Sequence, residues 1–228
     1  MMTYQNRSAI VWRSALSTTA TLVGGLLVGV LTGSLVHFGL PGSMAEAWRV
    51  GIAVVPALGG TLAGGALWGR VMAGLTGSRE THRMIWAGGL SFGPAVILAA
   101  LVLSALEVTL VEQGRAKLPL HIVFTLIFVP AASFVAASGG LALGIALRNR
   151  QLAARLALST GLVGGLAFLA INLMMYALGW VVGAPGAAQR ATMITVLMMS
   201  SLGAALTGGA VIGSVISNQK YSLPNEEF

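Results

Sequence analysis

Three titratable side chains fall near the ends of long apolar segments. Glu107 is the only acidic residue inside such a segment, His121 opens the next one, and His37 lies near the end of the first. A carboxylate with two imidazoles could form a proton or cation site, because an acidic group inside a bilayer is costly and marks function by default. The alternative is that Glu107 lies about one turn from a helix end and reaches the lipid headgroups.

Asn172 is the one strong amide deep inside an apolar segment. Such an amide more often cross-links two membrane helices through a hydrogen bond than binds a ligand, and both interpretations stay open. With the first three residues it forms a candidate polar site in an outer crevice.

Enzyme chemistry finds little support in the sequence. Ser138, within Ala136-Ala137-Ser138-Gly139, resembles the nucleophile setting of rhomboid intramembrane proteases, but the two apolar segments that follow contain no histidine base. There is no cysteine, no histidine pair with metal-ligand spacing and no phosphate loop. The sequence therefore predicts no catalytic residue, no metal and no cofactor.

Composition places the chain in a membrane. Of its 228 residues, 56% are apolar and 8% are charged, whereas about a quarter are charged in soluble domains. The length suits six spans of roughly 20–25 residues with short loops. We predict an all-α, single-domain polytopic protein over residues 1–228, with helices at about 14–38, 50–69, 84–110, 120–147, 157–182 and 191–217.

Positive charge predicts the orientation of these spans. Nine Lys and Arg side chains fall on the side of the two termini and four on the other side. Cytoplasmic loops carry the excess of positive charge, so we expect both termini in the cytoplasm, in the inner membrane of a prokaryote. Trp12, Trp68 and Trp86 would form the inner aromatic belt, and Trp48 and Trp180 the outer one. The competing interpretation of the first span is a cleaved signal peptide.

An arginine cluster on the inner side could bind phosphate headgroups of anionic lipids, although topology alone also explains it. Its members are Arg70, Arg79, Arg83, Arg148, Arg150 and Arg155. The expected partners are the bilayer and anionic lipids, not nucleic acid.

Glycines four residues apart recur in all six predicted spans. This GxxxG spacing brings two glycines to one face, where helix backbones approach closely. The predicted packing residues are Gly25, Gly29, Gly65, Gly69, Gly89, Gly93, Gly140, Gly144, Gly161, Gly165, Gly209 and Gly213. Leu58–Gly69 reappears in close form at Leu202–Gly213, which indicates three parallel helical-hairpin repeats. Most of these glycines lie in the inner halves, so we expect a bundle narrow at the inner side and splayed outside.

Two function classes follow. The favoured one is a non-catalytic subunit that packs its small-residue faces against other membrane subunits or a second copy. The alternative is a small-solute transporter, or its membrane-embedded binding component, with the ligand in an outward crevice.

Overall fold

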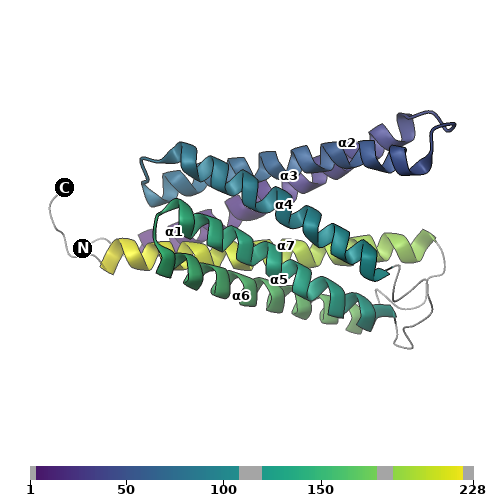
Figure 1. Cartoon of the computed structure of the whole chain (residues 1–228). Helices are drawn as coiled ribbons and strands as arrows, with labels where there is room; N and C mark the ends of the chain where they lie inside the picture. Colours follow the sequence, from purple (N-terminus) through teal and green to yellow (C-terminus); the bar gives the residue numbers. More distant parts are fainter. Residues whose placement is uncertain (1–3, 108–119, 179–186, 223–228) are drawn as a thin grey trace.

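The computed structural model describes residues 4–107, 120–178 and 187–222, and these are helical apart from short turns (Figure 1). The elements are α1 (Tyr4–Thr18), η1 (Thr19–Val23), α2 (Gly24–Gly39), α3 (Glu46–Thr76), α4 (Thr81–Glu107), α5 (Leu120–Ala146), α6 (Arg150–Ala177) and α7 (Ala187–Ser222). Here η1 is a single π-helical turn, so α1, η1 and α2 form one continuous rod. The prediction of an all-helical chain is confirmed for the described residues.

Four helical segments are long and apolar enough to cross a membrane: Arg7–Gly39, Thr125–Ala146, Arg150–Ala177 and Thr195–Asn218. The other two predicted spans correspond to α3 and α4. These helices have 31 and 27 residues, but their described parts do not reach the same apolar character. The structure thus supports a multi-pass membrane protein, and six spans with a threefold repeat stay a prediction.

Several predicted loop arginines lie on helices instead. Helix α3 continues past Arg70 to Thr76, and α6 begins at Arg150, so Arg155 also lies within it. Arginine favours helix about as well as leucine does, and a membrane helix therefore extends beyond its apolar stretch.

Specific residues end these extended helices. Gly77 stops α3 with a left-handed backbone at φ 69°, a conformation that costs glycine little. Asn149 begins α6 by accepting a hydrogen bond from the Leu152 amide at 2.9 Å. In the same α5–α6 turn, Arg148 holds φ 56°. The turns after α3 and after α5 are therefore short and sharply defined.

The helices form two groups, and α4 joins them by packing on α5 as well as on α3. Helices α2, α3 and α4 pack in sequence, as do α5, α6 and α7, and α1 packs on α7. The first rod therefore belongs to one group through α1 and to the other through α2. Figure 1 shows α2 and α3 diverging from α6 and α7 toward the end opposite the chain termini. This confirms the predicted splaying; which membrane side that end faces stays a prediction.

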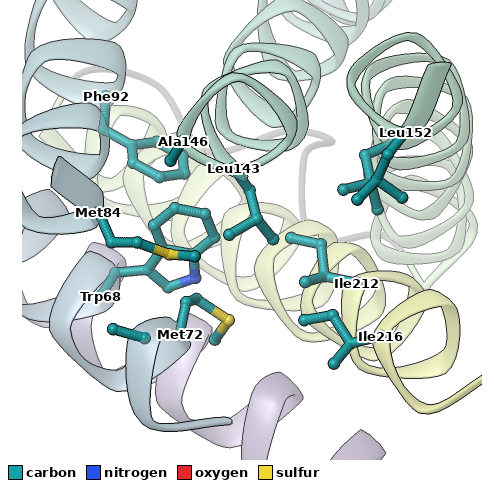
Figure 2. Close-up of a cluster of buried hydrophobic side chains, with 11 residues drawn as sticks. Trp68, Met72, Met84, Phe92, Leu143, Ala146, Leu152, Ile212 and Ile216 are labelled. Carbon is teal, nitrogen blue, oxygen red and sulfur yellow. The ribbon is translucent and has the colours of Figure 1, made fainter. Parts of the chain in front are cut away.

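The large buried side chains gather at the narrow end (Figure 2). Trp68, Met72 and Met84 come from the α3–α4 end, and Leu143 and Leu156 from the α5–α6 end. Trp68 is 1% exposed and stacks edge-to-face on Phe92 at 5.1 Å. Its assignment to an interfacial aromatic belt is therefore wrong, because the end of α3 turns this ring inward between the two helix groups.

Candidate ligand cavity

A cavity of about 280 Å³ lies between the two helix groups, at the middle of the bundle. One wall carries Leu22 and Leu26 from the first rod, with Phe92 and Val96 from α4. The opposite wall carries Phe128, Ala132, Phe168, Ala204 and Gly208 from α5, α6 and α7. Every described helix contributes at least one lining residue, so the cavity is central to the fold.

Bulky and small side chains alternate around this space. Three phenylalanines, Phe92, Phe128 and Phe168, hold helices apart, while alanine and glycine on α7 leave the space in front of them empty. A Cβ at Gly208 would meet no atom within 4 Å. Well-packed interiors leave few voids larger than a water molecule. A cavity of this size is therefore larger than the voids that ordinary helix packing leaves.

The cavity wall is almost wholly apolar. No charged residue lines it in the part of the chain that the structure describes. Its threonine hydroxyls bond inside the protein: Thr61 donates to the Leu58 carbonyl at 2.9 Å, and Thr160 to the Ala136 carbonyl at 2.9 Å. Thr18 accepts from Trp68 Nε1 at 3.0 Å and donates to the Ser14 carbonyl at 2.7 Å. These oxygens consequently offer a ligand little polarity.

Ser201 of α7 lines the cavity, and two further polar side chains, Asn172 and Ser200, lie near it along their helices without lining it. Asn172 is 8% exposed, and its Oδ1 accepts a hydrogen bond from Thr125 Oγ1 at 3.0 Å. Asn172 thus cross-links α6 to α5, as one of the two interpretations of this amide expects. Ser200 on α7 is fully buried, and its hydroxyl has no partner among the described residues. The sequence gives no reason to single out this serine among its neighbours.

The other candidates for the outer polar site are not brought together by the described residues. Glu107 ends α4 and His121 lies in the first turn of α5, but their side chains lie outside the described part. His37 lies near the far end of α2, partly buried and edge-to-face with Phe38 at 5.6 Å. A cation site from these three residues stays a prediction.

The arginines of the inner cluster lie near the narrow end, where the Glu80 carboxylate forms ion pairs with two of them. Glu80 pairs with Arg83 at 3.2 Å and with Arg148 at 3.0 Å. Arg83 also donates to the Ile145 carbonyl at 3.1 Å. These contacts join the α3–α4 turn to the α5–α6 turn, a link that sequence reasoning missed because 68 positions separate Glu80 from Arg148. The remaining cluster members, Arg70, Arg79, Arg150 and Arg155, are exposed.

Each of the twelve glycines of the predicted packing faces lies against another helix of this chain. A Cβ at Gly29 would lie 2.8 Å from the Pro56 carbonyl oxygen, and one at Gly213 would lie 2.7 Å from Val11 Cα. Gly25 and Gly29 face α3, Gly65 and Gly69 face α4, Gly89 and Gly93 face α3, Gly140 and Gly144 face α6, Gly161 and Gly165 face α5, and Gly209 and Gly213 face α1. These faces are therefore occupied within the chain.

Comparison with known proteins finds no matching family model, no matching curated protein and no matching solved structure.

Proposed function

We propose that this chain is a six-span inner-membrane protein that binds an apolar molecule in its central cavity, as a transporter or as the binding component of one. The observation that carries the proposal is the cavity of about 280 Å³ with an apolar wall. A dry apolar cavity of about 150 Å³ in a soluble protein already binds benzene or xenon. A larger one inside a bilayer has a supply of apolar molecules around it.

The splayed end supports access to this cavity. Among the described residues, α2 and α7 form no extensive contact, so the bundle is open between these two helices at that end. The other end is closed by the buried cluster around Trp68 and by the Glu80 ion pairs. An open end and a closed end around one central site are the arrangement that alternating access requires.

The packing-subunit interpretation has less support than the sequence suggests. It requires small-residue faces that are free to contact other subunits, and these faces already pack against neighbouring helices of the same chain. The exposed apolar side chains that remain, such as Leu31, Leu35 and Phe38 on α2, are what lipid contact requires. The cavity has no place in that interpretation.

Fluorescence quenching of Trp68 tests the proposal. Trp68 contacts Phe92 and Thr18, which both line the cavity. The protein would carry Trp68 as its only tryptophan, with phenylalanine at Trp12, Trp48, Trp86 and Trp180. In lipid nanodiscs, the apolar probe 1-bromodecane should quench Trp68 in a saturable manner, because bromine quenches on contact and the sites are limited.

Two glycines provide a matched pair of variants. Gly208→Leu should abolish the saturable quenching, because its side chain grows into the cavity. Gly59→Leu adds the same side chain in equally open space on the exposed face of α3, and quenching should persist. Quenching that rises without saturation, and equally in both variants, would show partition into lipid and would refute a binding cavity.

A further inference from the structure

Ser201 begins the cavity-lining stripe of α7. Ser201, Ala205, Gly208 and Ile212 all line the cavity, and their spacing of four, three and four residues places them on one face of the helix. Ser201 is the outermost of these residues, because α7 runs from the splayed end toward the chain termini. The stripe therefore carries its one polar side chain at the outer end of the cavity.

The Ser201 hydroxyl is the one free side-chain donor in the described cavity wall. The other lining hydroxyls, those of Thr18, Thr61 and Thr160, donate to backbone carbonyls at 2.7, 2.9 and 2.9 Å. A serine hydroxyl on a helix can bond in the same way to the carbonyl four residues before it. The Ser201 hydroxyl forms no hydrogen bond with another described residue. Its hydrogen is therefore available to a molecule in the cavity.

The surroundings of Ser201 are apolar. Helices α6 and α7 pack in opposite directions, and a Cβ at Gly164 would lie 3.8 Å from the Ala204 carbonyl oxygen. Four residues along α6 from this contact is Phe168, and three residues back along α7 is Ser201, so the two lining residues lie at nearly the same level. A buried water needs about three polar partners, which one serine beside a phenylalanine does not supply. A polar atom on an otherwise apolar ligand suits this donor better than water does.

We infer that the cavity binds an apolar molecule with one uncharged hydrogen-bond acceptor, such as a long-chain ketone or ester, and that Ser201 donates to this acceptor. The inference rests on the proposed function and names its ligand class. A ketone oxygen accepts the hydrogen bond without bringing a donor that the wall would have to satisfy. Phosphate and carboxylate groups are disfavoured because no charged side chain lines the described wall.

Trp68 can report on the far end of such a ligand. Gly209 lies eight residues beyond Ser201 on α7, about 12 Å by helix rise. A Cβ at Gly209 would lie 2.7 Å from Thr18 Oγ1, and this oxygen accepts from Trp68 Nε1 at 3.0 Å. When a ten-carbon ligand places its ketone at Ser201, a bromine at its other end consequently lies near the Trp68 ring.

Two ten-carbon probes test the inference in lipid nanodiscs, in the protein with Trp68 as its only tryptophan. With affinities expressed per mole fraction of probe in the lipid, 10-bromodecan-2-one should quench with about two- to tenfold higher affinity than 1-bromodecane, the value of one hydrogen bond. Ser201→Ala should remove this preference and leave the affinity for 1-bromodecane unchanged. Ser214→Ala, the same change at an exposed position of α7, should alter neither affinity.

The outcomes separate the role of Ser201 from the cavity itself. Equal affinities for the two probes, or a preference that Ser201→Ala leaves in place, would overturn the role of Ser201 while the cavity stands. Weaker binding of 1-bromodecane in Ser201→Ala would overturn it too, because the serine would then only shape the wall. Absence of saturable quenching by either probe would refute the proposed function instead.

Thermal unfolding without probe provides a second readout. Ser201→Ala should unfold at the same or a higher temperature, because alanine favours helix more than serine does and no bond within the protein is lost. A lower unfolding temperature would show that the hydroxyl bonds within the protein, and would overturn its role in ligand binding.

Discussion

The adjacent glycines Gly59 and Gly60 allow the close approach of α2 and α3 to be measured. A Cβ at Gly60 would clash with the Gly25 carbonyl and would lie 2.7 Å from Gly29 Cα, whereas a Cβ at Gly59 would meet no atom within 4 Å. Alanine favours helix over glycine by about 1 kcal/mol at either position. At Gly60 alone, overpacking adds a cost of about 1–3 kcal/mol. The propensity gain cancels in the comparison, so the difference between the variants isolates the contact.

We therefore expect Gly59→Ala to unfold at a higher temperature than Gly60→Ala. The assay is thermal unfolding in mild detergent, followed by tryptophan fluorescence. A gap of about 1–3 kcal/mol corresponds to roughly 2–12 °C for a chain of this length. Combining Gly60→Ala with Gly25→Ala should cost less than the sum, because both alanines push apart the same two backbones. Equal unfolding temperatures for the two single variants would refute the close approach.

Three further predictions concern orientation, the core and the ion pairs. A single cysteine at Ser43 should react with an impermeant thiol reagent in intact cells and one at Gln151 should not; the reverse pattern would invert the topology. Trp68→Phe removes the bond to Thr18 and part of the buried ring, so it should lower the free energy of unfolding by about 1–3 kcal/mol in denaturant titrations. Glu80→Gln should cost at most about 1 kcal/mol, since the side chains of Glu80 and its two arginine partners are 39–71% exposed, and the difference from wild type should shrink in high salt.

Hydropathy and glycine spacing predict much of the fold. Apolar length predicts where the helices lie, and GxxxG spacing marks residues such as Gly140 and Gly213 that lie against neighbouring backbones. Helix ends are less predictable. The end of α3 depends on a left-handed glycine at Gly77 rather than on hydropathy, and the extra turns before it carry Arg70.

The cavity could not be predicted from the sequence. Its volume arises because phenylalanines on three helices face small residues on a fourth, and no local pattern reveals which residues face each other. Trp68 is misplaced for the same reason, because a tryptophan near a span end is typical of an interface and only packing turns it inward. Ser200 is fully buried without a hydrogen-bond partner among the described residues, whereas the neighbouring Ser201 lines the cavity, and the sequence does not distinguish the two.

The π-helical turn Thr19–Val23 determines how the first rod would respond to the deletion of a single residue. A π-helical bond spans one more residue than an α-helical bond, so the turn adds roughly 100° of rotation between α1 and α2. Thr18 faces Gly209 of α7, while Gly25 faces Gly60 of α3. Thr18 and Gly25 are seven residues apart, and in an unbroken α-helix they would lie on the same face. Deleting one codon here would convert the π-helical turn to α-helix and leave the two residues six positions apart, about 120° around the axis, so both interfaces would keep their faces. A regular α-helix of unchanged length would instead align both faces and force the rod to choose a single partner helix.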